Sequence, residues 1–292
     1  MEGRGQDIVK ALIITGDDFG ISPQVNQAII KAHREGILTS ASLVVGGKAF
    51  EEAVDLARAN PGLSVGLHIV LVQGKSVLPH QRIPKLVDEE GNFPSNPILA
   101  GLRYFFQGEA AKEIREELKA QIEKFLSTGL TLAFINGHLN IHVHPRVFGI
   151  IMELGQELGI KNFRLPREEL LLTLRSDRSR MFSKLFHSIT FNLLSRYCKS
   201  VLEEKGFHFT DKVYGLLQSG DMNASYVRAL IRGITRGVNE VYFHPCLLPC
   251  PEYSRWMPEY HPGEELEVLV SKEIKELISA SSIQLVDYSA LQ

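Results

Sequence analysis

The sequence has few cysteines, no excess of basic residues and no long apolar run. Cys198, Cys246 and Cys250 are an odd number of cysteines in a chain of 292 residues, which argues against a disulfide framework, so we expect reduced thiols. The formal net charge of −2 lacks the basic surplus that drives binding to phosphate backbones, so no nucleic-acid partner is predicted. No apolar run approaches the roughly 20 residues that span a bilayer, and residues 1–10 lack the apolar core of a secretion signal. A cytoplasmic protein is therefore expected.

Two of the cysteines leave one alternative open. The spacing of Cys246 and Cys250, with His244 nearby, is compatible with metal ligands. Pro245 and Pro249 interrupt this stretch, however, and the chain has no second cysteine pair. Structural thiols are the interpretation that we favour.

The chain also lacks a G-x-G-x-x-G fingerprint after its first predicted strand, which disfavours a dinucleotide-binding fold. It contains instead a regular alternation of short β-type runs and longer helical patterns. The predicted strands cover residues 11–15, 41–45, 64–69, 132–136, 162–165, 212–216, 240–243 and 283–288. The predicted helices lie within residues 23–35, 49–58, 97–127, 145–158, 176–204, 225–235 and 264–279.

This alternation predicts an α/β fold in which helices cover a parallel sheet that is either closed as a barrel or open and doubly wound. With 44% hydrophobic residues the chain can form an extensive core, and we expect one domain over residues 1–292. Active residues of a barrel lie at the carboxyl ends of its strands. The positions of reactive side chains therefore test this fold.

Polar side chains that could act in catalysis fall at the carboxyl ends of several predicted strands. They are Asp17, Asp18, His68, His138, His142, Arg164 and His244. Each has a simpler explanation alone: the aspartates could cap a turn, His68 could be a core histidine, and Arg164 or His244 could belong to an ion pair. Together, at one edge of one sheet, they favour a metal site.

The run "GHLNIHVHP" adds to this interpretation. In an extended conformation, His138, Asn140, His142 and His144 would share one face of the strand. In a helical conformation, His138 and His142 would still lie one above the other at i and i+4. Both conformations would bring imidazoles together, and clustered imidazoles suit a divalent metal.

A catalytic metal site keeps one coordination position open. One carboxylate and two imidazoles make a three-ligand set that leaves this position for a water, and the metal lowers the pKa of that water toward ~7 and polarises a bound carbonyl. A second carboxylate could take the water's proton. Asp17 and Asp18 can divide these two roles, because adjacent residues on an extended backbone point in different directions. With His244 as a proton donor across the site, the chemistry indicates hydrolysis of an amide or ester.

Four motifs in this order, "TGDDFGIS", "GLHIVLVQGKSVLP", "INGHLNIHVHP" and "EVYFHP", resemble the YdjC-like carbohydrate deacetylases, relatives of the NodB-type polysaccharide deacetylases, over nearly the whole chain. The segments "SPQVNQAIIKAHREGILTSASLVVGG", "RIPKLVDEEGNFP" and "VYGLLQSGDM" are more similar to the hopanoid biosynthesis-associated branch than to the chitooligosaccharide branch. The resemblance implies a distorted TIM-like (β/α) barrel of seven or eight strands that removes N-acetyl groups from amino sugars. For the hopanoid branch, the implied substrate is an N-acetylglucosaminyl hopanoid.

The resemblance also implies roles for the residues that match the motifs. Asp18, His68 and His138 become metal ligands, Asp17 the general base, His244 the acid, Arg164 the residue that orients the aspartate, and His142 a residue near the site. The cofactor is one divalent metal ion, Mg²⁺ or Zn²⁺, because the family is described with magnesium whereas an Asp-His-His set suits zinc. The family often has an aspartate in place of Asn136 and a histidine in place of Asn140. These departures put sugar recognition in doubt more than hydrolysis.

Other functions stay open beside this one. The chain could be a deacetylase of chitooligosaccharides or other N-acetyl sugars, another metal-dependent barrel such as a sugar isomerase or phosphoesterase, or a non-catalytic sugar- or lipid-binding barrel. The two aspartates and both ligand histidines are retained, which argues against the last of these. The assembly is left open, with a homodimer as one alternative.

A helical insertion is predicted around residues 168–210. Within it, residues 171–200 hold six basic side chains against one acidic side chain, Asp177, although the whole chain is slightly acidic. Apolar residues occur among the charges, partly at helical spacing. This segment is either an ordinary outer helix with its apolar face in the core or a flap that lies peripherally on an anionic inner membrane.

Overall fold

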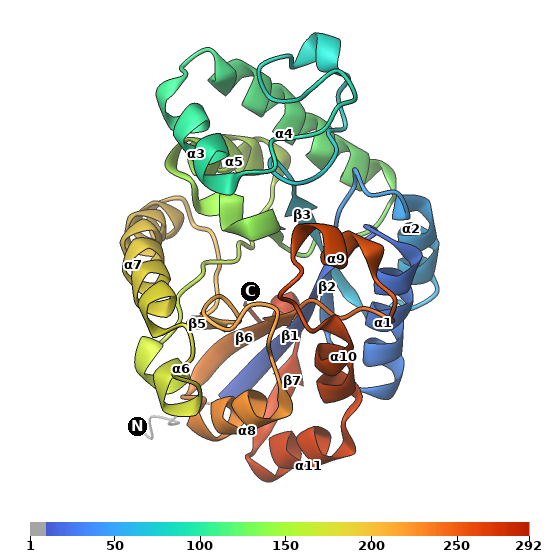
Figure 1. Cartoon of the computed structure of the whole chain (residues 1–292), viewed down its shortest axis with the longest axis vertical. Coiled ribbons are helices and arrows are strands. Elements are labelled where there is room, and N and C mark those ends of the chain that lie inside the picture. Colours follow the sequence, from blue (N-terminus) through green and yellow to red (C-terminus); the bar gives the residue numbers. More distant parts are fainter. Residues whose placement is uncertain (1–9, 292) are drawn as a thin grey trace, which may run out of the picture.

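The computed structural model of the chain describes residues 10–291 and consists of a seven-stranded parallel sheet with helices packed around it (Figure 1). Residues 1–9, which make up most of the segment that we tested for a secretion signal, lie outside the described residues. The strands are β1 (Lys10–Phe19), β2 (Ser40–Leu43), β3 (Ser64–Ile69), β4 (Ile135–Gly137), β5 (Lys212–Tyr214), β6 (Gly237–Phe243) and β7 (Ile283–Val286).

The sheet is a curled half-barrel, whereas the family resemblance implied a distorted TIM-like (β/α) barrel of seven or eight strands. Its strand order is β4-β3-β2-β1-β6-β5, and β7 pairs with β1. One edge of the long strand β1 serves two partners, because β7 pairs with residues 10–13 and β2 with residues 15–19. Within residues 10–291, β4 and β5 stay edge strands, so the prediction of a parallel α/β sheet is confirmed and that of a complete barrel is not.

The predicted strand at 162–165 is the element that is missing from the sheet. Its residues form only isolated bridges, Ile135 with Phe163 and Asn162 with His208. The segment is nevertheless anchored to β4, because the backbone N–H of Arg164 donates to the carbonyl of Ile135 at 2.9 Å. An extended segment of this kind still delivers Arg164 to the edge of the sheet.

Most helices occur where the sequence predicts them. They are α1 (Pro23–Glu35), α2 (Phe50–Arg58), α3 (Pro97–Phe106), α4 (Ala110–Ser127), α5 (Pro145–Leu158), α6 (Leu170–Ser176), α7 (Met181–Glu204), α8 (Ala224–Gly233), α9 (Pro251–Trp256), α10 (Pro262–Val270) and α11 (Lys272–Ala280). The predicted helix within 97–127 is divided at Gly108, and the one at 264–279 is divided at Ser271, which caps α11. Neither α9 nor α6, which ends where the helix predicted within 176–204 was to begin, was predicted. Among these described helices, none is long and apolar enough to cross a bilayer.

The local signals that begin and end α1 show why these predictions succeed. Ser22 caps the helix by accepting a hydrogen bond from the backbone N–H of Val25, and Pro23 occupies the first turn, where no N–H is needed. The helix ends at Gly36. A Cβ at this position would lie 2.1 Å from the carbonyl oxygen of Leu269, so glycine lets α1 and α10 approach closely.

Candidate active site

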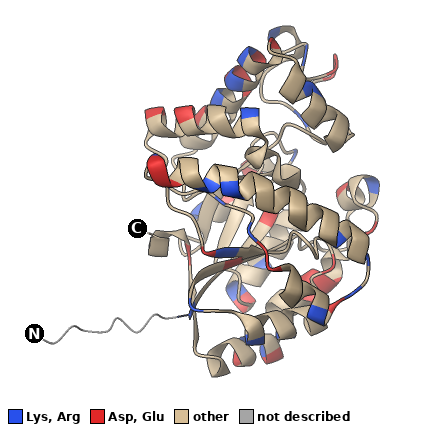
Figure 2. Cartoon of the chain, turned by 90° about the vertical axis from the view of Figure 1, so that its left-hand side faces the viewer, with Lys and Arg blue, Asp and Glu red and all other residues tan. Residues whose placement is uncertain are grey.

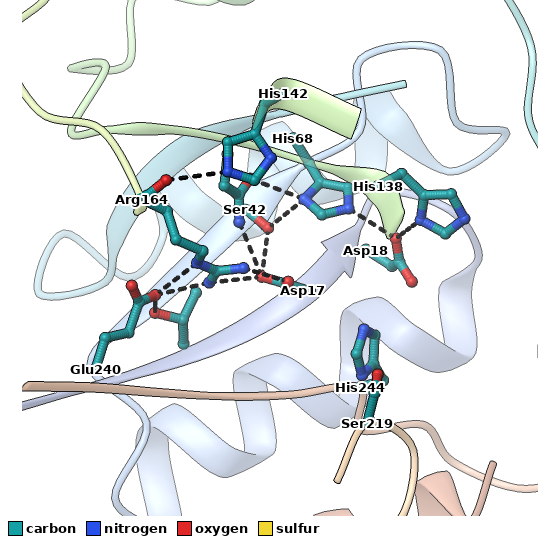
Figure 3. Close-up of polar contacts among 12 residues, drawn as sticks. Asp17, Asp18, Ser42, His68, His138, His142, Arg164, Ser219, Glu240 and His244 are labelled. Carbon is teal, nitrogen blue, oxygen red and sulfur yellow. Dashed lines mark hydrogen bonds and ion pairs between the residues drawn. The ribbon is translucent and has the colours of Figure 1, made fainter. Parts of the chain in front are cut away.

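The carboxyl end of β1 separates the two adjacent aspartates. The pairing between β1 and β2 shifts register between residues 16 and 19, and Asp18 has a φ of 65°. This left-handed conformation is one that aspartate tolerates better than most residues. As a result, Asp17 and Asp18 contact different groups of side chains (Figure 3).

Asp18 lies against two imidazoles. Its Oδ1 atom is 3.3 Å from Nε2 of His68 at the end of β3 and 3.1 Å from Nδ1 of His138 after β4. The other oxygen, Oδ2, accepts a hydrogen bond from the hydroxyl of Tyr253 at 3.1 Å. All three candidate ligands are buried, and their ligand atoms lie within 4.8 Å of one another.

The hydrogen bonds of His68 test whether this group fits a cation. Nδ1 of His68 lies 2.8 Å from Oδ1 of Asn136, which can only accept, so Nδ1 carries the proton and the lone pair of Nε2 points toward Asp18. Nε2 has no hydrogen-bond partner among residues 10–291. Burial works against a charge here, yet the carboxylates of Asp18 and Asp17 raise the pKa of His68. The position therefore favours a positive charge, and a divalent cation fits it.

Asp17 belongs to a buried ion-pair network. Its two oxygens accept hydrogen bonds from Arg164 at 2.5 and 3.0 Å, and the same guanidinium donates to Oε1 of Glu240 at 2.7 and 3.0 Å. Burial alone would raise the pKa of Asp17, but the charge of Arg164 outweighs it and lowers this pKa to about 2. Asp17 is therefore an ionised carboxylate in a fixed orientation.

Glu240 is a site residue that the sequence analysis missed. It lies in β6, and its two oxygens also accept hydrogen bonds from Thr15 at 2.7 Å and Tyr288 at 2.6 Å. The residue is fully buried. A signal was available, because a glutamate inside a predicted buried strand requires a charged partner. The sequence could not show that this partner is Arg164.

Asn136, one of the two departures from the family pattern, contacts two residues of the site. Its Oδ1 contacts His68, and its Nδ2 donates to Oδ1 of Asp17 at 3.2 Å. The side-chain amide thus connects His68, a candidate metal ligand, to the ionised Asp17. It does not line the cavity in which a sugar would lie. Asn140, in contrast, does line that cavity, so the doubt about sugar recognition concerns this residue alone.

The prediction that His138 and His142 come together is wrong. Residues 138–143 form a 3₁₀ segment in which Leu139 and Asn140 have positive φ angles of 49° and 54°. This conformation directs His138 toward Asp18, whereas Nε2 of His142 donates to the carbonyl of Arg164 at 3.0 Å. Burial lowers the pKa of His142 to about 3, so a neutral imidazole supports the backbone of the arginine.

His244 follows β6 and lies across the site from the aspartates (Figure 3). Its ring packs 5.0 Å from that of Tyr260, and its backbone N–H donates to Glu265 at 2.5 Å. Burial lowers the pKa of His244, although the two aspartates oppose this effect. The imidazole is therefore uncharged at neutral pH and faces the cavity.

The cysteines do not join a metal group. Cys246 and Cys250 are buried free thiols, as is Cys198. Over the described part of the chain, the His, Cys, Asp and Glu side chains that gather closely enough to share a cation are Asp18, His68 and His138 only. The interpretation of these cysteines as structural thiols is consistent with this arrangement.

A cavity of about 710 Å³ opens over this group of residues. Asp17, His68, His138 and His244 line its polar end. Apolar side chains of α3 and α7 line another part, among them Ile98, Leu102, Phe105, Phe191 and Leu194, and α7 also contributes polar ones such as Lys184 and His187. The cavity therefore joins the reactive residues to a wall that contains several large apolar side chains.

The family model described as YdjC-like protein matches residues 11–280. The chain belongs to the YdjC-like family. Two relatives of this YdjC-like chain are named carbohydrate deacetylase: one from Brevibacillus brevis, 34% identical over 96% of this chain and 99% of the relative, and one from Vibrio parahaemolyticus, 30% identical over 96% of both.

Solved structures resemble the YdjC-like chain over almost its full length. A protein from Enterococcus faecalis V583 named for cellobiose-phosphate cleavage is 26% identical, with a TM-score of 0.76 over 97% of this chain and 99% of that one. An uncharacterized protein from Agrobacterium tumefaciens, 12% identical with a TM-score of 0.52 over 97% of this chain and 89% of that one, shares the fold alone.

Proposed function

We propose that this YdjC-like protein is a carbohydrate N-deacetylase, a hydrolase that removes an N-acetyl group from an amino sugar. Its family relatives carry the name carbohydrate deacetylase. The main support for the proposal is that the two adjacent aspartates at the end of β1 have different partners. Asp18 faces two imidazoles, and Asp17 is held separately by Arg164. Amide hydrolysis with a metal requires these two functions side by side.

The residues would act as follows. Asp18, His68 and His138 would hold one divalent cation, Mg²⁺ or Zn²⁺, which when bound polarises an amide carbonyl and acidifies water. Asp17, ionised and oriented by Arg164, would accept the proton that the attacking water loses. The C–N bond of the amide would break as the new C–O bond of acetate forms.

His244 is proposed to protonate the departing amine. Its imidazole lies across the cavity from Asp17 and is uncharged before the reaction, because burial lowers its pKa. During the reaction, the proton that Asp17 takes from the water would pass to His244, and the imidazolium formed in this way would give it to the amine, so the reaction needs no other proton source. The products are acetate and a free amino sugar.

For the substrate, we propose an N-acetylglucosaminyl hopanoid glycolipid. The motif segments that resemble the hopanoid branch support this choice, as do the large apolar side chains of α3 and α7 in the cavity wall. We further propose that residues 1–292 form one catalytic domain in the cytoplasm and that residues 168–210 are its helical insertion. Chitooligosaccharides are the alternative substrates.

Acetate release tests the proposal. Metal-loaded protein is expected to release acetate from N-acetylglucosamine oligomers or from an N-acetylglucosaminyl hopanoid, and the faster of the two identifies the substrate class. His244→Ala should lower kcat by about 100-fold while the cation content stays unchanged. Phosphate release or sugar isomerisation without acetate would contradict the proposal, as would a His244→Ala variant with the wild-type rate.

A further inference from the structure

The helix α7 exposes its large apolar side chains. Phe182, Phe186, Ile189 and Leu193 are spaced three or four residues apart and so lie on one face, which Leu185 borders. Phe182 is 82% and Phe186 68% exposed. Over residues 181–198 the opposite, fully buried positions carry polar or small side chains, at residues 184, 188, 195 and 198, whereas Leu202 is buried farther along and Phe191 and Leu194 pack partly against the core. The first turns of α7 are therefore the reverse of an ordinary outer helix, whose apolar face packs into the core.

The helix α3 also exposes large apolar side chains. It buries Ala100 and Tyr104. Its exposed large apolar side chains are Ile98, Leu99, Leu102, Phe105 and Phe106, the last of which is 75% exposed. We call the outward faces of α3 and of residues 181–193 the apolar rim. Contiguous exposed surfaces of this kind mark binding sites for proteins or membranes.

The apolar rim borders the mouth of the active-site cavity. Ile98, Leu102 and Phe105 line the cavity and are at least half exposed, and His187 of α7 lines it from the other side. Figure 1 shows α3 above α7 on one side of the molecule. Whatever covers the apolar rim therefore also meets the entrance to the active site.

Basic side chains predominate along the two segments that carry the apolar rim, although Glu109 and Asp177 flank them. Residues 95–108 and 178–200 contain no acidic residue. Arg103, Arg178, Arg180 and Arg196 belong to these stretches, and none of the four forms an ion pair with another residue of the described range 10–291. Basic residues lie near both ends of α7, and its two acidic residues lie at the C-terminal end (Figure 2).

We propose that the apolar rim is a docking surface for an anionic lipid bilayer. Its large side chains would enter the boundary between headgroups and acyl chains, and the arginines would contact anionic headgroups. A second copy of the chain fits less well, because the two rims would oppose arginines of like charge and would close the cavity mouth. This inference rests on the proposed function in one respect: a docked deacetylase could take a lipid-linked substrate directly from the membrane.

Vesicle sedimentation tests this docking surface. The full chain is mixed with phosphatidylcholine vesicles that contain or lack phosphatidylglycerol, at low and at high salt. Wild-type protein should bind the anionic vesicles, and more weakly at high salt. Phe106→Ser/Phe182→Ser/Phe186→Ser should weaken partitioning roughly tenfold or more, and Arg178→Glu/Arg196→Glu by at least as much, since each basic residue near an anionic surface contributes a factor of about five.

Matched controls separate docking from folding and from catalysis. Leu126→Ser/Leu158→Ser removes two exposed leucines outside the apolar rim and should bind as wild type does. The triple phenylalanine variant should retain thermal stability and acetate release from a soluble oligomer, because none of its three positions lines the cavity.

Two results would overturn the inference. One is equally negligible vesicle binding by the wild type and by all variants. The other is a dimer in analytical ultracentrifugation that the phenylalanine variant dissociates, without vesicle binding. Vesicle binding that depends on the apolar rim, combined with no acetate release from any N-acetyl sugar, would instead contradict the proposed reaction and support the docking surface.

Discussion

Arg164 connects two buried carboxylates that cannot both be stable without it. It is almost fully buried, and it donates to Asp17 on one side and to Glu240 on the other. Both carboxylates raise the pKa of the guanidinium far above its usual value despite its burial. Removing one member of such a network leaves the others as uncompensated buried charges. The orientation of Asp17 therefore depends on a residue that never reaches the cavity.

Glu240→Gln tests this dependence. The amide keeps the shape of the side chain but removes the charge that anchors the far side of Arg164, so Asp17 should lose its fixed orientation. We expect kcat to fall by about 10-fold to 100-fold, because small misplacements of a catalytic group cost this much, with little change in KM. Glu273→Gln, an arginine-paired glutamate on the surface, is the control. An unchanged kcat in Glu240→Gln would show that Arg164 is held by Asp17 alone.

The two adjacent aspartates should differ when each is neutralised. Asp17→Asn should reduce acetate release about 100-fold or more while the bound cation is retained, because the base is lost and the ligands remain. Asp18→Asn should lose the cation as well, since Asp18 faces His68 and His138. Metal analysis of the purified variants, together with rates, measures both effects. Loss of the cation in Asp17→Asn with retention in Asp18→Asn would reverse the assignment.

Buried carboxylates hold the loops that follow the strands. Glu117 of α4 accepts the backbone N–H groups of Val77 and Leu78 at 2.8 and 2.9 Å in the loop after β3. Glu168 accepts three N–H groups from residues 215–217 in the loop after β5, at 2.8 to 3.2 Å. These N–H groups lie beyond the ends of the strands, so no neighbouring strand can satisfy them. The second loop contributes Leu216 to the cavity wall, so these contacts also shape the site.

Glu168→Ala should destabilise the protein strongly. Three backbone N–H groups would lose their acceptor, and each buried unsatisfied group costs about 1–3 kcal/mol, so we expect a loss of about 3 kcal/mol or more in the free energy of unfolding. Glu168→Gln should cost less, because its amide oxygen can still accept. Urea denaturation measures both. The neighbour Glu169 pairs with Lys212 at the surface, and Glu169→Ala should cost below about 1 kcal/mol. Equal losses for the two alanine variants would contradict this role.

Glu265 makes the stability of the entire fold depend on pH. This residue of α10 is fully buried and accepts the backbone N–H groups of Met222 and His244, which lie on two other segments. Burial raises the pKa of its carboxyl to about 7 from the ordinary 4.5. The folded state therefore binds a proton more tightly than the unfolded chain. The contribution of this proton to stability is fully present below about pH 4.5 and is lost as the pH rises toward about 7.

Glu265→Gln should remove this part of the pH dependence. As the pH rises from about 4.5 to 7, the wild type should lose about 3 kcal/mol more of its free energy of unfolding than the variant does. This magnitude follows because each pKa unit corresponds to ~1.4 kcal/mol. Urea denaturation at several pH values measures this slope. Glu267→Gln changes an exposed glutamate of the same helix and should leave the slope unchanged. A Glu265→Gln variant with the wild-type slope would assign the effect to other groups.

Local signals in the sequence were sufficient for most elements. The cap formed by Ser22 and Pro23, the stop at Gly36 and the short β-type runs predict helices and strands, because these features depend on neighbouring residues and on the period of apolar positions. The same reasoning brought Asp18, His68 and His138 to one edge of the sheet, since carboxyl ends of parallel strands lie together. The parallel α/β class and the gathering of these side chains thus follow from the order of residues, whereas their assignment as metal ligands came from the family resemblance.

Contacts between distant segments decided the partners of the site residues, the closure of the sheet and the orientation of α7. Asp17 and Arg164 are 147 residues apart, and the partner of Glu240 becomes evident only when β1, β6 and the segment at 162–165 lie side by side. The turn at residues 139–140 that separates His138 from His142, and the sheet that curls without closing, likewise depend on packing. Periodicity identifies the apolar stripe of α7, but which way the stripe faces depends on what the rest of the chain packs against that helix. Here the core accepts the polar or small side chains at residues 184, 188, 195 and 198 and leaves Phe182 and Phe186 outside.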